Sequence, residues 1–149
     1  VLNATDTIFA LALASNHQPE QHFFEAYRQL HALGELQCSA IYLMPCRDGV
    51  GADYYNAACL LTSDIAVEQL LEQLKALEHA SGRVRPSHQI SLDVDLIAWG
   101  SCLSVMQFNP KKLPLALDVK IPMYDMWPDP AFCHAAHAYT QVHLEQCAV

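Results

Sequence analysis

Apolar and β-branched residues form four short runs along the chain, and each run is typical of a β-strand. The runs cover residues 7–14, 36–43, 54–62 and 91–99. The first is apolar along nearly its whole length, which indicates a central strand that is buried on both faces. In the last, leucine and valine alternate with two aspartates, so its two faces differ in polarity.

Two segments between these runs have the period of an amphipathic helix. Residues 18–33 carry aromatic and leucine side chains at helical spacing, with Gly34 positioned to end the helix. Residues 65–80 carry a leucine-rich stripe. The dipeptide at 63–64 is expected to cap this second helix, and Gly82 is expected to close it.

The predicted order β-α-β-β-α-β is that of a ferredoxin-like α+β fold. It places residues 7–14 and 54–62 in the centre of an antiparallel sheet, with both helices on one face. Five prolines lie between residues 110 and 130, so the C-terminal third is expected to begin irregular. It is predicted to end in a helix over residues 130–146, which gives an α/β/α-layered domain with a C-terminal helical extension. We expect residues 1–149 to form a single domain.

The two aspartates of the last run carry the main candidate chemistry. Asp93 and Asp95 share one face of the predicted strand, roughly 6–7 Å apart along it, and repel each other unless a cation lies between them. Mg²⁺ is held by one or two carboxylates together with waters and substrate phosphates. The pattern therefore suggests metal-assisted phosphoryl chemistry. The tripeptide alone also fits a strand whose wet face happens to carry two aspartates.

Composition argues against several classes of function. The net charge is −8 with only eight Lys and Arg residues, which disfavours nucleic-acid binding. With 52% hydrophobic and 16% charged residues the chain is globular, and no apolar run approaches the length of a membrane span. The first residues lack the basic start of a signal peptide. We expect a cytoplasmic protein without a membrane or nucleic-acid partner.

The six cysteines and eight histidines show no clear metal-binding or disulfide pattern. The cysteines have no CxxC spacing, and Cys38 and Cys59 lie in predicted strands, where a reduced thiol behaves as a small apolar side chain. Cys133, His134 and His137 invite a zinc site, because the two histidines would share a face of the predicted C-terminal helix. No carboxylate or further histidine nearby in the sequence completes a zinc ligand set.

Several motifs occur in an order that resembles one enzyme family. They are Ala14-Ser15-Asn16 after the first run, Asp53-Tyr54-Tyr55-Asn56-Ala57-Ala58 on the third, Glu78 through Arg85 after the second helix, and Leu92-Asp93-Val94-Asp95. The segment Ile121-Pro122-Met123-Tyr124-Asp125-Met126 extends the match weakly. Together they are similar to the 6-hydroxymethyl-7,8-dihydropterin pyrophosphokinases of the folate pathway. That family moves the β,γ-pyrophosphoryl group of ATP onto the pterin hydroxymethyl group and releases AMP.

The resemblance implies a role for each matching residue on the metal and pterin sides. Asp93 and Asp95 would hold the magnesium ions that bridge the phosphates of ATP, the co-substrate. Tyr54, Asn56 and Pro45 would line the pterin pocket, where the Asn56 amide meets both donors and acceptors of the pterin edge. Without the resemblance, Tyr54 also fits simple packing on the sheet.

On the nucleotide side the resemblance implies Glu78, Arg83, Arg85 and Tyr124. Arg83 carries a planar guanidinium suited to phosphate oxygens. We expect Arg83, together with Asp93 and Asp95, to be catalytic. Without the resemblance, an arginine just after a helix C-terminus is more often a surface charge that complements the helix dipole.

The sequence departs from the family pattern where phosphate charge is neutralised. Ile90 stands where the family has an arginine, and Met123 stands where it has a nucleotide-contacting histidine. A further family arginine has no counterpart after Met126, while Lys111 and Lys112 are candidate replacement cations. One such electrostatic donor typically contributes a factor of roughly 10²–10³ to the rate, so these changes bear directly on activity.

Two functions from different classes follow. The first is a Mg²⁺-dependent pterin pyrophosphokinase, weakened by the lost cations or supplied with substitutes. The second is a catalytically inactive paralogue that binds a pterin, a nucleotide or a protein partner. The retained Asp93 and Asp95 favour the enzyme, because a binding module has little reason to keep a repelling pair, whereas Ile90 and Met123 favour the paralogue. A third reading is an unrelated ferredoxin-like domain with an incidental Asp-x-Asp.

Overall fold

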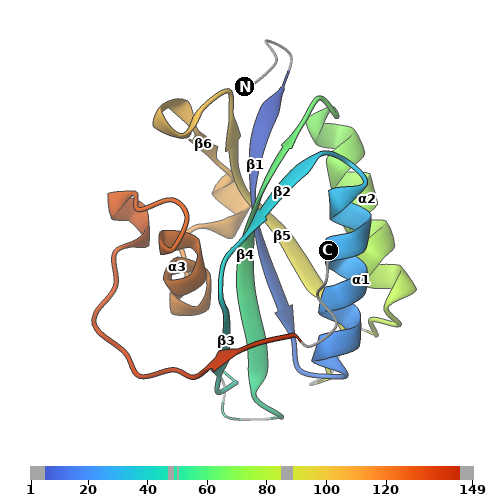
Figure 1. The fold of residues 1–149 in the computed structure, drawn as a ribbon, viewed down its shortest axis with the longest axis vertical. Helices are drawn as coiled ribbons and strands as arrows, with labels where there is room; N and C mark the ends of the chain where they lie inside the picture. The colour runs from blue at the N-terminus through green and yellow to red at the C-terminus, as the bar shows by residue number, and fades with distance from the viewer. Residues whose placement is uncertain (1–5, 47–48, 50, 85–88, 145–149) are drawn as a thin grey trace.

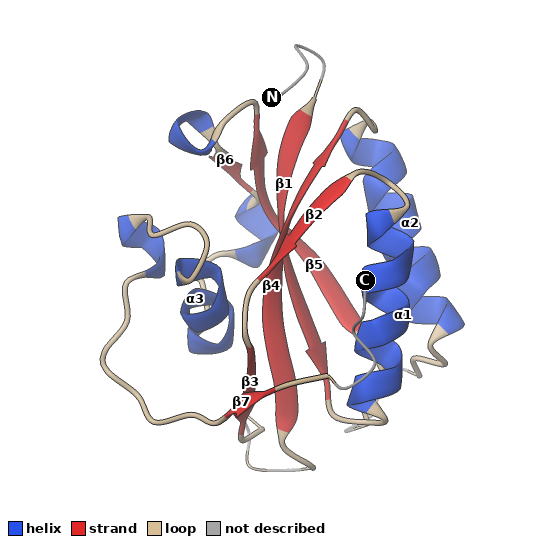
Figure 2. Cartoon of the chain, in the orientation of Figure 1, coloured by secondary structure: helices blue, strands red, loops and turns tan. Residues whose placement is uncertain are grey.

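The computed structural model describes residues 6–46, 49, 51–84 and 89–144. They form an antiparallel sheet with helices on both faces (Figures 1 and 2). The helices are α1 (Pro19–His31), α2 (Val67–Ala80) and α3 (Leu117–Tyr124), with short 3-10 turns η1 (Leu103–Val105), η2 (Pro110–Lys112) and η3 (Pro130–Phe132). The strands are β1 (Thr7–Ser15), β2 (Glu35–Cys38), β3 (Ile41–Met44), β4 (Tyr54–Ser63), β5 (Asp93–Gly100), β6 (Gln107–Phe108) and β7 (Gln141–Val142).

The strand order confirms the predicted α+β class. It runs β6-β5-β1-β4-β3-β7, and β2 also pairs with β4. The two strands predicted to be central, β1 and β4, pair along the whole of β1, from Thr7–Ser63 to Ser15–Tyr55. No helix in the described part of the chain is both long and apolar enough to cross a membrane.

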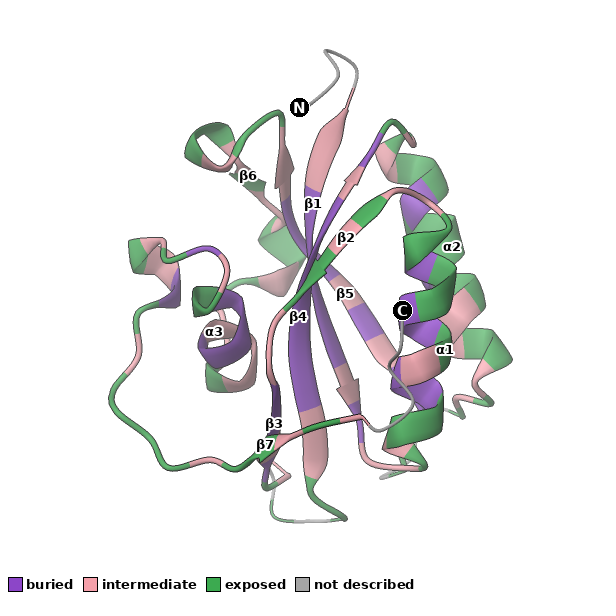
Figure 3. Ribbon diagram, in the orientation of Figure 1, coloured by how far each residue is buried: buried purple, intermediate pink, exposed green. Residues whose placement is uncertain are grey.

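Alternating side-chain sizes along β1 give the sheet two different faces. Phe9, Leu11 and Leu13 pack against α1 and α2, whereas Ala10 and Ala12 face the layer that contains α3. The large residues fill the wide core under two helices, and the alanines let α3 and the chain after it approach closely. Figure 3 shows the buried residues concentrated in the central strands and on the inner sides of the helices.

The predicted strand over residues 36–43 is interrupted. Ser39 and Ala40 separate β2 from β3, and both strands pair with β4. At the break, the Ser39 hydroxyl accepts a hydrogen bond from the backbone N–H of Ala58 at 2.9 Å. A side chain therefore replaces part of the ladder there. Cys38 is exposed, contrary to its expected apolar role, whereas Cys59 is fully buried.

The helix ends agree with the prediction for α2 only at its C-terminus. Gly82 has φ +86° directly after the C-cap residue Ser81, as expected. The expected N-cap is wrong, because α2 begins after Ala66 and the Ser63 hydroxyl bonds to Leu33 O instead. Gly34 lies three residues after the end of α1. It is required by a close approach, since a Cβ there would collide with the backbone of Thr62.

The helix predicted over residues 130–146 is wrong. The C-terminal extension does contain a helix, α3, but residues 133–140 are irregular and β7 follows them. The stretch has many alanines and no continuous apolar stripe that a helix could bury. It instead supplies β7, which pairs with β3 through Ile41–Val142 and Tyr42–Gln141 and covers an otherwise open sheet edge.

Candidate active site on the α3 face of the sheet

Asp93 and Asp95 begin β5 and lie on the face of the sheet that α3 covers. Both are partly exposed, while Val94 and Leu96 between and after them are buried in the core under α1 and α2. The alternation of β5 therefore separates the two carboxylates from the apolar core. The strand presents both acids to the same side, as the sequence pattern predicts.

The register of the sheet places these acids in rows with residues of β1 and β4. Ala14 pairs with Asn56 on one side and with Asp93 on the other, while Ala12 pairs with Asp95. Asn56 and Asp93 are thus separated by one strand, a backbone distance of about 10 Å. Only alanine side chains of β1 lie between them, so the sheet surface between the Asn56 amide and the carboxylates is low and forms the floor of the site.

A pocket of about 300 Å³ lies over this floor. It brings together the two aspartates and the three residues predicted for the pterin side, Tyr54, Asn56 and Pro45. The other lining residues, of which the sequence had drawn attention only to Ala14 and Ile90, come from β1, the loop after β3, the segment before β5, and α3. They are Ala12, Leu13, Ala14, Cys46, Ile90, Asp118 and Val119.

Each of the two aspartates is paired with a cation. Nε of Arg83 lies 3.2 Å from Oδ1 of Asp93, and Nζ of Lys112 lies 2.9 Å from Oδ1 of Asp95. These pairs offset the repulsion between neighbouring carboxylates. Of the two candidate replacement lysines in the sequence, Lys112 is the one that the structure brings to the acids.

The C-terminal cap of α2 delivers Arg83 to the site. The N–H of Gly82 donates to His79 O at 3.0 Å, and the N–H of Arg83 donates to Glu78 O at 3.3 Å. This is a Schellman motif, which requires the left-handed conformation of Gly82. The chain leaves the helix towards β5, so Arg83 meets Asp93 with a side chain that is only 8% exposed.

Glu78, from the last turns of α2, contacts the backbone of β5. Its Oε2 accepts a hydrogen bond from the N–H of Val94 at 2.9 Å, between the two aspartates. Among the described residues, β5 pairs on that side only with the short β6, at Ala98 and Trp99. The Glu78 carboxylate thus takes the place of a neighbouring strand. Glu78 is not among the residues that line the pocket, and its predicted contact with a nucleotide stays a prediction.

The turn after β1 holds the segment before β5. The side-chain Oδ1 of Asn16 accepts from the N–H of Ile90 at 2.6 Å, and the backbone N–H of Asn16 donates to Ile90 O at 2.9 Å. This two-point contact fixes Ile90 in the pocket wall. Ile90, which is expected from the sequence to stand at a family arginine position, therefore lines the pocket itself.

Tyr54 enters the site as a neutral phenol. Burial raises its pKa to about 12, and the neighbouring Cys46 and Asp93 side chains contribute to the increase. The hydroxyl therefore keeps its proton at physiological pH and can act as a hydrogen-bond donor. The Cys46 side chain forms a hydrogen bond with Tyr54. No motif in the sequence marks Cys46, apart from its position next to Pro45.

Other predicted site residues lie further away. Tyr124 ends α3 and packs edge-on against His134, with ring centroids 5.5 Å apart, and it is not among the residues that line the pocket. Met123 is fully buried in the core beneath α3, where a charged histidine would be unfavourable. Arg85 lies outside the described residues, so its predicted nucleotide contact stays a prediction.

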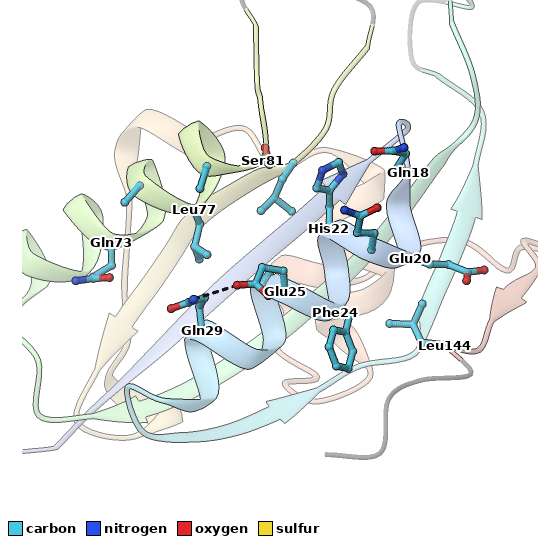
Figure 4. Close-up of a pocket in the computed structure, with 15 residues that line it drawn as sticks. Gln18, Glu20, His22, Phe24, Glu25, Gln29, Gln73, Leu77, Ser81 and Leu144 are labelled. Carbon is cyan, nitrogen blue, oxygen red and sulfur yellow. Dashed lines mark hydrogen bonds between the residues drawn. The ribbon is translucent and has the colours of Figure 1, made fainter.

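A larger cavity, of about 970 Å³, lies on the opposite face between α1 and α2 (Figure 4). Its polar side chains include Glu20, His22 and Glu25, and the Gln29 amide donates to Glu25 at 3.0 Å. Neither lysine nor arginine occurs among the described residues that line it. Arg28 pairs with Glu25 but does not itself line the cavity, and a lining that carries acids and no Lys or Arg disfavours a polyphosphate, so chemistry rather than size selects the smaller pocket.

The family comparison agrees with this geometry. The family model described as 7,8-dihydro-6-hydroxymethylpterin-pyrophosphokinase (HPPK) matches residues 10–137, which include every residue of the pocket. The chain belongs to the HPPK family. No individual curated protein matches the sequence significantly.

The donor set of the pocket fits the magnesium ions that HPPK family enzymes use with ATP. Asp93 and Asp95 supply hard carboxylate oxygens at the mouth of a polar pocket, where side-chain exposures of 28% and 39% leave room for water and phosphate ligands. Two carboxylates are the usual protein contribution to such a site. The ion pairs with Arg83 and Lys112 show that positive side chains already offset the negative charge of these two aspartates.

The histidines near the C-terminus do not form the helical pair considered from sequence. The rings of His134 and His137 lie 5.5 Å apart in an irregular segment, and His137 also contacts Tyr42 and Tyr139. Within the described ranges, no group of three or more His, Cys, Asp and Glu side chains is arranged around a common metal position. These rings therefore form an aromatic cluster beside β3.

Replacing Glu78 tests whether the α2 cap supports the acid pair. Glu78→Ala leaves the buried N–H of Val94 without its carboxylate acceptor, and we expect a loss of about 1–3 kcal/mol in the free energy of unfolding. Glu78→Gln keeps an oxygen acceptor and should lose less. Urea denaturation measures both, and an alanine variant as stable as the wild type would contradict the assignment.

Proposed function

We propose that this chain transfers the β,γ-pyrophosphoryl group of ATP to 6-hydroxymethyl-7,8-dihydropterin in a Mg²⁺-dependent reaction. The observation that supports this most is the convergence of Asp93 and Asp95 with Tyr54, Asn56 and Pro45 on one pocket. The HPPK match covers the same residues. The residues proposed to hold the metal and those proposed to bind the pterin thus line the same pocket, as a reaction between the two substrates requires.

The proposed reaction makes few covalent demands on the protein. The pterin hydroxymethyl oxygen attacks the β-phosphorus of ATP, the bond from that phosphorus to the α-phosphate bridging oxygen breaks, and AMP leaves. The hydroxymethyl proton passes to solvent or to the phosphates. Bound magnesium would neutralise the phosphate charge, and Asp93 and Asp95 are the residues to hold it. Beyond charge neutralisation, the protein has to hold the hydroxymethyl oxygen in line with the bond that breaks at the β-phosphorus.

On the pterin side, Asn56 supplies an amide that is only 2% exposed. Its Nδ2 donates to Tyr54 O at 3.3 Å, which fixes the side chain at the start of β4. A buried amide offers both a donor and an acceptor, which matches the alternating pattern of a pterin edge. Because this recognition uses neutral groups, the neutral phenol of Tyr54 is compatible with it.

A second candidate function is binding without transfer. The observation that favours it is Ile90, which lines the pocket where the family sequence has an arginine. An apolar side chain there cannot stabilise charge that develops on the transferred phosphates. An inactive paralogue that binds a pterin, a nucleotide or a protein partner would retain the pocket while losing the reaction.

Product analysis distinguishes the two functions. With ATP, Mg²⁺ and 6-hydroxymethyl-7,8-dihydropterin, we expect wild-type protein to form AMP and pterin pyrophosphate in equal amounts. Asp95→Ala removes a metal ligand and should lower the rate at least about 10²-fold. Chromatography of both products provides the measurement.

Omission of the pterin is the control, since transfer requires both substrates whereas a contaminating hydrolase does not. Folded wild-type protein that forms no AMP with both substrates would contradict the transfer reaction. The binding function would then be the better account.

Asn56→Ala tests the pterin side separately. Loss of a buried amide that pairs with the ligand should weaken pterin binding about tenfold or more, measured by calorimetry or fluorescence titration. Gln37→Ala, an exposed change on β2, is the matched control and should leave the affinity unchanged. If a folded Asn56→Ala variant binds the pterin as tightly as wild type, Asn56 does not belong to the pterin site.

A further inference from the structure

Lys112 reaches the acid pair from η2, the turn that follows β6. Its Nζ lies 2.9 Å from Oδ1 of Asp95, and the two side chains are 38% and 39% exposed. Water screens an ion pair at this exposure, so that it contributes little to folding. Lys112 can therefore exchange Asp95 for another anion at little cost.

The position of Lys112 does not depend on this ion pair. Asn109 anchors η2 to β5, because its backbone N–H donates to Ile97 O at 2.8 Å and its side-chain amide donates to Leu96 O at 2.9 Å. The N–H of Lys112 then donates to Asn109 O at 3.0 Å. Backbone contacts with the strand that carries Asp95 thus hold the lysine next to it.

Arg83 and Lys112 differ in how firmly they are held. Arg83 is 8% exposed, and besides Asp93 it donates to Val84 O at 2.7 Å. Lys112 has a flexible stem with three rotatable donors, and its Nζ contacts Asp95. Of the two cations, Lys112 is the one suited to change partners.

Metal binding at Asp95 favours such a change. Asp118 joins Asp93 and Asp95 in the lining of the pocket, and a nucleotide would add the negative charge of its phosphates to theirs. When a metal ion takes an Asp95 oxygen, that oxygen no longer suits an ammonium group. The released Lys112 then lies beside the place where metal-bound phosphates must lie.

We infer that Lys112 exchanges partners, pairing with Asp95 in the ligand-free pocket and with a phosphate oxygen of the nucleotide when Mg²⁺ binds that carboxylate. The inference rests on the proposed function, which assigns the nucleotide phosphates to the aspartates. It gives Lys112 two effects of opposite sign. The lysine competes with a metal ion that binds alone, and it strengthens the binding of a metal–nucleotide complex.

Lys112→Met tests both effects, because methionine keeps most of the apolar stem and removes the charge. Binding of Mn²⁺ alone, measured by electron paramagnetic resonance, should become about twofold to fivefold tighter, since a screened ion pair no longer competes. Binding of α,β-methylene-ATP with Mg²⁺, measured by calorimetry, should become about tenfold weaker, since a charge-assisted hydrogen bond is lost.

Two variants control for the change in charge and for damage to the fold. Lys111→Met removes the neighbouring charge from an exposed side chain and should change neither constant. Lys112→Arg keeps the charge and should restore most of the nucleotide affinity. Thermal unfolding of each variant verifies that the fold is intact.

The inference requires both shifts in Lys112→Met, and any other combination in a folded protein overturns it. Asp95→Asn separates this failure from failure of the proposed function. Nucleotide affinity that is lost in Asp95→Asn but kept in Lys112→Met removes only the role of Lys112. Nucleotide affinity that survives Asp95→Asn removes the metal site on which the proposed function depends.

Discussion

The repulsion between Asp93 and Asp95 is the constraint around which this site is built. Two carboxylates that leave one face of a strand are unfavourable unless positive charge accompanies them, and Arg83 and Lys112 supply it. Both cations arrive along the outer edge of β5. There Glu78 and Asn109 bond to backbone groups that β6 leaves unpaired, and the cation follows each anchor by three to five residues. Structural anchoring and charge compensation therefore come from the same two segments.

The remainder of the fold provides space beside this edge. Alanines on one face of β1 keep the floor low, and the large residues on its other face hold α1 and α2. The two departures from the HPPK pattern expected from the sequence, Ile90 and Met123, lie in different places. Ile90 lines the pocket, whereas Met123 is buried in the core under α3. In the proposed reaction, an apolar wall at Ile90 leaves the cation from η2 more important to phosphate binding.

Elements with a clear hydrophobic period could be predicted from the sequence. Segments whose conformation depends on contacts with distant parts of the chain could not. The central strands, α1, α2 and the shared face of the aspartates follow from local patterns. The C-terminal segment was misassigned because its alanines favour a helix while the open edge of β3 offers a strand partner 100 residues away. In the site, the aspartates and Asn56 were found through motifs. Asp118 and Cys46 lacked any motif, and the choice of Lys112 over Lys111 depended on how Asn109 anchors the turn.

The most direct test of this account is a crystal structure with Mg²⁺, α,β-methylene-ATP and 6-hydroxymethyl-7,8-dihydropterin, since the methylene bridge prevents transfer. We expect metal ions bound by both Asp93 and Asp95, with the pterin beside Asn56. Electron density for the nucleotide in the cavity between α1 and α2, or phosphates that approach neither aspartate, would contradict it.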